Sequence, residues 1–411
     1  MNDSSISPTP LSSARPGLET LAVHAGELPD PATGASSPNL VMSSTFLADP
    51  EASFSAEGSH GEDAYFYTRW ANPTVTQLEQ KLAALENAEA AMAFASGMAA
   101  VNALFFHCLK PGDHLLLGDV IYAAVSETAN DLLAELGIAV TRVDTSDLDA
   151  VRAGIRDDTR LVYIESPCNP ILRLTDITAV AEIAAEAGAR LAVDSTFATP
   201  VATRPIELGA DFVVHSLTKY LGGHGDAVGG ALLGPMEDLA EVRRKAGIRM
   251  GGVISPFNAW LILRGMATLP LRMRAHETNA IEVGQFLQQH PVVSKVTYPG
   301  FESHPQFELA RHQMDNFSGM LTFQADRHAE LPRLFAKHLQ VIHYAVSLGH
   351  HRSLLFYIPT DEILKTSFSL TKAQESGYRE FAGDALFRLS VGIENPADLC
   401  ADLERSFAAL P

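Results

Sequence analysis

The sequence predicts an α/β fold in which a large domain with a mostly parallel sheet is followed by a smaller α+β domain. Short apolar strands alternate with helices between residues 114 and 215, and this alternation is typical of βαβ units. Beyond Pro291 the pattern changes to short strands with flanking helices, which indicates a second domain of the α+β type. The 411 residues are sufficient for both domains.

Composition limits the partners that this chain can bind. With 30 basic and 49 acidic residues the formal net charge is −19, which argues against nucleic acid or an anionic membrane surface as a partner. The most apolar window, 88–106, contains Glu89 and Asn102, so it predicts a buried region and not a membrane span. The three scattered cysteines form neither a disulfide framework nor a metal-ligand spacing; we therefore expect a cytoplasmic protein without a metal site.

The first 72 residues show no sustained hydrophobic period. Residues 1–17 are rich in Ser and Pro and predict a disordered tail. Residues 18–72 contain frequent Pro, Gly and Ser, which predicts an extended arm that packs on another surface, such as a second subunit. Tyr67 and Arg69 lie just before a helix predicted over 74–85. They form either a solvated loop or a site where a guanidinium grips a phosphate.

The large domain, 73–265, is predicted as an ordered series of strands and helices. A strand-like segment runs into the turn Ser96-Gly97-Met98, which opens a helix over 99–108. The free N–H groups at such a helix start can bind an anion. The next predicted elements are strand 114–117, helix 122–136, strand 139–143, strand 161–165, helix 177–187, strand 190–193 and strand 212–215.

Polar residues follow several of these strands, at the edge where parallel sheets bind their ligands. The segments are 165–169, 194–196 and 216–219, and Tyr122 begins the helix after strand 114–117. Taken alone, Asp194 is more simply a helix cap, and Lys219 is more simply a solvated surface charge. Several such groups on one rim predict a ligand site.

The small domain, 266–411, supplies one further candidate. Arg388 alternates with Phe387 and Leu389 in a predicted strand. It either faces outward or uses its planar fork to hold a carboxylate.

One chemistry uses all of these parts, namely that of a pyridoxal phosphate enzyme acting on an amino acid. Lys219 can form a Schiff base, and Asp194 can keep a pyridine nitrogen protonated. Tyr122 can stack on the ring, the Ser-Gly-Met turn and the Ser-x-Thr segment can hold the phosphate, and Arg388 can bind the substrate carboxylate.

The chain resembles the Cys/Met-metabolism family of pyridoxal phosphate enzymes, which has the aspartate aminotransferase-like (type I) fold. The resemblance covers nearly everything from Thr20 to Glu394. The motifs that carry it are Tyr67-Thr-Arg69-Trp-Ala-Asn-Pro-Thr, Phe94-Ala-Ser-Gly-Met-Ala-Ala, Glu165-Ser-Pro-Cys-Asn-Pro, Val193-Asp-Ser-Thr-Phe-Ala-Thr-Pro, His215-Ser-Leu-Thr-Lys-Tyr and His304-Pro-Gln-Phe-Glu-Leu-Ala.

The resemblance implies a role for each matching residue. Lys219 would hold the cofactor and shuttle protons, Asp194 would pair with the ring nitrogen, and Tyr122 would stack on the ring. The expected phosphate ligands are Gly97, Met98, Ser216 and Thr218, with Tyr67 and Arg69 from a neighbouring subunit; the expected substrate ligands are Asn169, Ser347 and Arg388; and the expected catalytic residues are Lys219, Tyr122 and Tyr67. A site shared between subunits implies a homotetramer built as a dimer of dimers.

One segment departs from the family pattern. After Ser347-Leu-Gly349 the family usually continues Gly-x-Glu, whereas this chain reads His350-His351-Arg352. The change falls where the distal substrate pocket is expected, and we expect Arg352 to contact the substrate there. Ala124 stands where methionine γ-lyases carry a cysteine.

We therefore predict a carbon–sulfur lyase that acts on sulfur amino acids such as methionine or cystathionine by α,γ-elimination, releasing a thiol, 2-oxobutanoate and ammonia. The alternatives are γ-replacement on an O-acylhomoserine, by a cystathionine γ-synthase or a sulfhydrylase, and a cystathionine β-lyase. For γ-replacement, a basic pocket formed by Arg352 and His351 would suit a second carboxylate. A catalytically silent relative is disfavoured because Lys219, Asp194 and Arg388 are all present.

Overall fold

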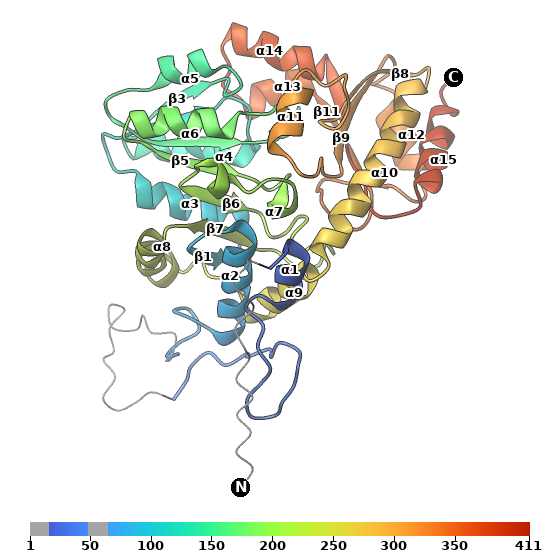
Figure 1. The fold of residues 1–411 in the computed structure, drawn as a ribbon. Helices are drawn as coiled ribbons and strands as arrows, with labels where there is room; N and C mark the ends of the chain where they lie inside the picture. The colour runs from blue at the N-terminus through green and yellow to red at the C-terminus, as the bar shows by residue number, and fades with distance from the viewer. Residues whose placement is uncertain (1–15, 48–64) are drawn as a thin grey trace.

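The computed structural model describes residues 16–47 and 65–411, and these form two sheets with their covering helices (Figure 1). Residues 1–15 of the predicted tail, 1–17, and residues 48–64 of the predicted arm, 18–72, therefore lie outside the described residues. The larger sheet has seven strands in the order β1-β7-β6-β5-β4-β2-β3, and the smaller has five in the order β10-β11-β12-β9-β8. The long helix α10 runs diagonally from α9, at the base of the larger part, to the side of the second sheet near β8 (Figure 1).

The elements are bounded as follows. The large sheet consists of β1 (Ala90–Phe94), β2 (His114–Gly118), β3 (Ala139–Val143), β4 (Thr159–Glu165), β5 (Arg190–Asp194), β6 (Phe212–His215) and β7 (Gly230–Gly234). The α-helices that precede, connect or directly follow these strands are α1 (Leu18–His24), α2 (Pro73–Glu86), α3 (Gly97–Cys108), α4 (Ala123–Thr128), α5 (Leu148–Gly154), α6 (Ile177–Glu186), α7 (Thr199–Ala202) and α8 (Met236–Val242). Shorter turns are the π-helical η1 (Ala129–Leu133) and η3 (Arg243–Met250), and the 3-10 turn η2 (Pro205–Leu208).

The remainder forms the second sheet and the helices around it. Its strands are β8 (Val293–Thr297), β9 (Met320–Ala325), β10 (His343–Tyr344), β11 (Leu354–Pro359) and β12 (Ala385–Ser390). The helices are α9 (Pro256–Met266), α10 (Leu269–Gln289), α11 (Phe307–Gln313), α12 (Leu331–His338), α13 (Thr360–Thr366), α14 (Lys372–Ala382) and α15 (Pro396–Phe407).

Helices cover both faces of the large sheet, because alternate residues of its strands point to opposite sides. Leu115 and Leu117 of β2 belong to a buried cluster with α3 and α8, whereas Leu116 belongs to a second cluster with α5 and α6. This double burial explains why the strands read as continuous apolar runs. The predicted helix over 74–85 is confirmed as α2, which Asn72 caps by accepting the Thr74 N–H at 2.9 Å.

The predicted parallel core is confirmed, because β3, β2, β4, β5 and β6 pair in parallel. β7 was not predicted from the sequence; it lies antiparallel between β1 and β6. Parallel register places the ends of β4 and β5 together, and Glu165 lies directly opposite Asp194. Two carboxylates therefore meet at the ligand-binding edge of the sheet.

Two predicted elements need correction. The arm begins with the helix α1 and not with extended chain, because Lys81 of α2 is buried beneath it, donates to the Ala22 carbonyl at 2.7 Å and pairs with Glu27. The helix predicted over 122–136 is α4 only to Thr128 and then widens into the π-helical turn η1.

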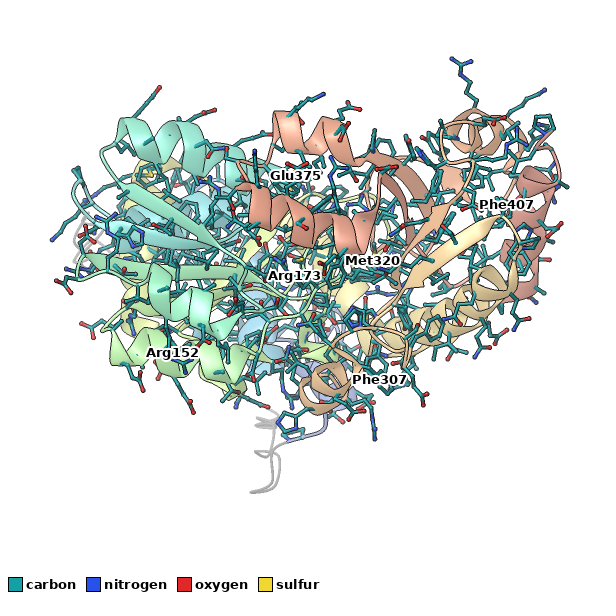
Figure 2. All side chains as sticks on the ribbon, turned by 90° about the horizontal axis from the view of Figure 1, so that it is seen from above. Arg152, Arg173, Phe307, Met320, Glu375 and Phe407 are labelled. Carbon is teal, nitrogen blue, oxygen red and sulfur yellow. The ribbon has the colours of Figure 1, made fainter. Side chains whose placement is uncertain are left out.

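The lysine loop after β6, residues 216–223, lies at the junction between the two sheets. Leu217 and Tyr220 of this loop share a buried cluster with Met320 of β9 and with Leu348. Arg272 of α10 donates to the Tyr220 carbonyl at 2.7 Å. Seen from above, Met320 lies near the middle of the molecule and Phe407 at the far side of the second sheet (Figure 2). Both parts of the chain therefore fix the loop.

No helix within residues 16–47 and 65–411 combines the length and apolar character needed to cross a bilayer. The apolar window 88–106 contributes to β1 and α3 instead.

Replacing Gly230 by Ala tests how closely β7 approaches the turn at Ser96. A Cβ at position 230 would lie 2.1 Å from the Ser96 carbonyl oxygen, so the turn must shift, and we expect Gly230→Ala to lower the free energy of unfolding by about 3 kcal/mol or more. Denaturant unfolding measures this value. Gly377→Ala is the matched control, because a Cβ there meets nothing within 4 Å, and it should stabilise α14 by up to ~1 kcal/mol. Equal stability of the two variants would contradict the close approach.

Candidate active site

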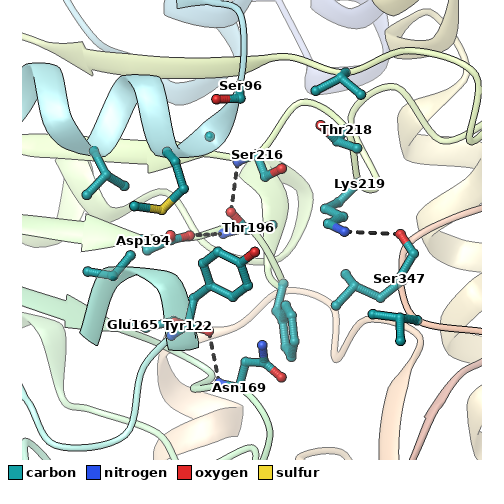
Figure 3. Close-up of a pocket in the computed structure, with 18 of the residues that line it drawn as sticks. Ser96, Tyr122, Glu165, Asn169, Asp194, Thr196, Ser216, Thr218, Lys219 and Ser347 are labelled. Carbon is teal, nitrogen blue, oxygen red and sulfur yellow. Dashed lines mark hydrogen bonds between the residues drawn. The ribbon is translucent and has the colours of Figure 1, made fainter. Parts of the chain in front are cut away.

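A pocket of about 310 Å³ opens at the carboxyl ends of β4, β5 and β6. Figure 3 shows that side chains from both domains face it, with Lys219 and Ser347 on one side and Asp194 and Tyr122 on the other. The structure brings together most of the residues named from the sequence. Its lining includes Gly97, Met98, Tyr122, Asn169, Asp194, Ser216, Thr218, Lys219, Ser347 and Arg388.

Lys219 reaches the pocket from the loop that follows β6. Its Nζ donates to the Ser347 hydroxyl at 3.0 Å. Burial, together with the positive charge of Arg388, lowers the pKa of Lys219 to about 8, because both effects disfavour the protonated amine. A substantial share of this amine is therefore neutral near pH 8, as a nucleophile or a base requires.

Asp194 and Glu165 form a buried acidic pair at the floor of the pocket. The Tyr163 hydroxyl donates to Asp194 at 3.2 Å, and the Thr196 N–H donates to Asp194 at 3.0 Å. Burial raises the pKa of Asp194, and burial together with the Asp194 charge raises the pKa of Glu165 well above its ordinary value. Within the described chain no Lys or Arg forms an ion pair with either carboxylate. A cation from a ligand, such as a protonated ring nitrogen, would supply the missing charge.

An anion site lies at the start of α3. Ser96 caps this helix by accepting the Ala99 N–H at 3.1 Å, while the N–H groups of Gly97 and Met98 have no acceptor among the described residues. Ser216 faces this turn so closely that a Cβ on Gly97 would lie 3.2 Å from the Ser216 Cβ. Free N–H groups and nearby hydroxyls are the donors that a phosphate needs.

Arg388 of β12 faces inward and forms the opposite end of the pocket. Its guanidinium donates to the Asn169 side chain at 2.7 Å and to the Ser347 carbonyl at 3.3 Å. Burial lowers the pKa of Arg388 to about 10, so the group stays charged at neutral pH. Neutral partners orient it without neutralising it, and its charge is available to a substrate carboxylate.

Tyr122 stands at the rim, just before α4. Its backbone N–H donates to Glu165 at 2.6 Å, and its side chain is 47% exposed. The ring lies beside the pocket between Asp194 and Asn169 (Figure 3), where a planar ligand can stack on it.

Three residues predicted for the site lie outside this pocket. Tyr67 is 43% exposed and Arg69 stacks over its ring at 5.6 Å, with a further hydrogen bond to the Ile248 carbonyl. Arg352 is exposed and does not line the cavity. The roles of Tyr67 and Arg69 in a neighbouring subunit's site and the role of Arg352 stay predictions.

The roles of several residues that line or support the pocket were not predicted from the sequence. Glu165 was placed at the end of a strand, but its pairing with Asp194 depends on the register of β4 and β5. Tyr163 reads as an ordinary core residue of β4, although its hydroxyl holds Asp194. The lining that was missed also includes Val101, Val125, Phe197, Val228, Val346 and Leu348.

A model of the family described as Cys/Met metabolism PLP-dependent enzyme matches residues 19–408. The chain belongs to this family. Its cofactor is therefore pyridoxal phosphate, and the free helix start, the buried Asp194 and the half-neutral Lys219 fit the phosphate, ring nitrogen and aldehyde of that group.

Named relatives cover almost the whole chain. An L-methionine gamma-lyase from Porphyromonas gingivalis is 40% identical over 402 residues, which are 96% of this chain and 98% of the relative. A cystathionine gamma-synthase from Mycobacterium bovis is 42% identical over 390 residues, 95% of this chain and 96% of the relative. The crystal structure of a cystathionine gamma-lyase from Lactobacillus plantarum with L-serine superposes with a TM-score of 0.85 at 37% identity, covering 96% of this chain and 99% of that one. The predicted aspartate aminotransferase-like fold is confirmed.

The hydrogen bond between Tyr163 and Asp194 gives a test of the cofactor site. Tyr163→Phe removes a donor that stabilises the Asp194 anion, so the ring nitrogen loses part of its counter-charge, and cofactor affinity should fall by about tenfold. Titration of the cofactor-free protein with pyridoxal phosphate, followed by absorbance, measures this. Tyr378→Phe is the control, because that buried hydroxyl has no hydrogen-bond partner within the described chain. Unchanged cofactor affinity in Tyr163→Phe would contradict a role of the Tyr163 hydroxyl in cofactor binding.

Proposed function

We propose that this protein cleaves the γ-carbon–sulfur bond of L-amino acids that carry an uncharged thioether or thiol, such as methionine and homocysteine. The observation that carries the proposal is the distribution of charge in the pocket. Among its described lining residues, Lys219 and Arg388 are the only cations. Arg388 is hydrogen-bonded to Asn169, at the end of the pocket where we expect the substrate carboxylate. Three further lining residues are apolar, namely Val228 and Val346, which are exposed in the single chain, and Leu348, which is buried.

An apolar wall favours an uncharged substrate chain over one that ends in a second carboxylate, because a buried charge needs a partner. Cystathionine and O-succinylhomoserine both carry such a carboxylate. Arg352 would be its natural partner, but it points to solvent in the single chain. This favours elimination from methionine-like substrates.

The residues of the pocket divide the work of the reaction. Arg388 binds the carboxylate and fixes the amino acid, with Asn169 and Ser347 holding the guanidinium. Lys219 in its neutral form accepts the Cα proton at Nζ and carries protons at Cβ. Pyridoxal phosphate, when bound, supplies the electron sink for the charge left at Cα. Tyr122 would stack on the cofactor ring, and Asp194 would hold its protonated ring nitrogen.

A replacement reaction is the second candidate. The observation in its favour is the cystathionine gamma-synthase relative, which matches this chain as well as the methionine gamma-lyase does. In that case a thiol adds at the γ-carbon of an O-acylhomoserine. A β-lyase acting on cystathionine stays a third possibility, and the predicted cytoplasmic location stays a prediction.

The first experiment measures 2-oxo acid release by purified holoenzyme from methionine, homocysteine, cystathionine and O-acylhomoserines, each with and without added thiol. We expect 2-oxobutanoate from methionine and homocysteine without any acceptor. Solvent deuterium should enter Cβ of the recovered substrate, because only the γ route removes a proton from that position before the leaving group departs. Thioether formation from O-acylhomoserine, with no turnover of methionine, would replace the lyase proposal by the synthase one.

We also propose that active sites are shared between subunits of a homotetramer, with Tyr67 and Arg69 completing a neighbour's site. Both residues lie on the surface of the single chain, away from its own pocket.

Mixed oligomers test this sharing. Lys219→Ala and Arg69→Ala should each be inactive alone. When they are co-expressed in equal amounts, one site of each mixed pair receives both lesions and the other receives neither, so about a quarter of wild-type activity should return. Homogeneous oligomers that are mixed without subunit exchange serve as the control. Absence of recovery in oligomers shown to be mixed would place Arg69 in its own subunit's function.

A further inference from the structure

A line of three polar groups runs from the pocket into the segment that precedes β11. Lys219 Nζ donates to the Ser347 hydroxyl at 3.0 Å, and this hydroxyl lies 3.2 Å from His350 Nε2. The lysine comes from the large domain, whereas Ser347 and His350 come from the small one. His350 does not line the pocket itself, so any effect that it has on the lysine passes through Ser347.

The serine in the middle is held in one place. Its backbone has φ = 147°, a conformation that residues other than glycine rarely adopt and that persists only where the surroundings enforce it. Its carbonyl accepts from Arg388 at 3.3 Å, and the N–H of Gly349 donates to the Ser390 hydroxyl at 2.8 Å. The Ser347 hydroxyl therefore cannot move far to find another partner.

The His350 ring is also fitted closely. A Cβ on Gly225 would lie 2.6 Å from His350 Nδ1, so the backbone at Gly225, just beyond the lysine loop, packs directly against the imidazole. The ring is half-buried, and its Nε2 edge faces the serine. This packing holds the ring in the orientation that places Nε2, and not Nδ1, beside the Ser347 hydroxyl.

The charges around the ring favour its neutral form. Burial and the positive charge of Lys219 lower the pKa of His350, and His351 and Arg352 act in the same direction, while Asp226 opposes them. Arg388 is the further cation beside Lys219. A neutral ring with its proton on Nδ1 offers Nε2 as an acceptor. The single proton of Ser347 can then point to His350, which leaves the oxygen lone pairs for the ammonium of Lys219.

We propose that His350 is a positioning residue for Lys219, because it orients the Ser347 hydroxyl so that this hydroxyl accepts from Nζ and favours the protonated amine. The inference deepens the proposed function, since it rests on Lys219 as the residue that carries protons at the substrate. It does not depend on which leaving group the pocket takes.

The test measures the titration of Lys219 in the full-length chain freed of cofactor, where the amine is unblocked. A small amine-reactive reagent is applied over a pH series, and labelling at Lys219 is quantified by peptide mass spectrometry. His350→Leu removes the acceptor, and we expect the pKa of Lys219 to fall by about half a unit to one unit. His350→Gln should keep the wild-type titration, because the amide oxygen reaches the Nε2 position and still accepts.

Coupling through the serine is tested by a double-mutant cycle. Ser347→Ala should lower the pKa of Lys219 as His350→Leu does, and the double variant should show no further fall. His351→Gln is the matched control: its ring lies 3.3 Å from the Gly223 carbonyl and not against Ser347, so the titration should not change. Rebinding of pyridoxal phosphate reports that each variant is folded. In holoenzyme reloaded with cofactor, the pH profile of kcat should shift in His350→Leu and should not shift in His350→Gln.

An unchanged Lys219 titration in His350→Leu would overturn the proposal. An equal shift in His350→Gln would do the same, since it would show that only packing matters, and so would additive effects of the His350 and Ser347 substitutions. Failure of the lyase assay is a separate outcome, because the labelling of Lys219 needs no substrate.

Discussion

The half-buried Lys219, the buried Arg388 and two buried carboxylates share one pocket in this protein, and no ion pair joins them among the described residues. Lys219 and Arg388 are held by neutral oxygens, and Asp194 and Glu165 by hydroxyl and N–H groups. Burial of unpaired charge is costly, and the shifted pKa values of Lys219 and Glu165 record that cost. A ligand that brings a phosphate, a cationic ring nitrogen and a carboxylate supplies the counter-charges that the protein omits.

This arrangement needs support from both sheets. The acidic pair depends on the parallel register of β4 and β5, whereas Arg388 comes from an antiparallel strand of the other sheet. The lysine loop lies between them and is fixed by Arg272 and by shared apolar packing. The spacing between the proton carrier and the carboxylate clamp is therefore set by domain packing, and not by any single element.

The parallel strands of the large sheet, the helices α2, α3 and α6, and the rim of polar residues could be predicted from periodicity, because their burial pattern is local in the sequence. β7 was missed since Gly230-Ala-Leu-Leu-Gly234 is short and carries no alternation, and α1 was missed since its helix depends on contact with the distant Lys81. The partnership of Glu165 with Asp194 depends on register, and that of His350 with Ser347 on a fold-wide approach of two domains. No local pattern encodes either contact.

The side chains proposed to bind the cofactor and those proposed to face the far end of the substrate belong to different parts of the chain. The turn at the start of α3, Asp194 and Lys219 lie in the large domain, whereas Val346 and Leu348 lie in the short segment before β11. A few substitutions in that segment can alter which leaving group is accepted while the electron sink stays intact. Proteins that share the cofactor residues can in this way differ in the reaction that they favour, as the names of the lyase and synthase relatives do.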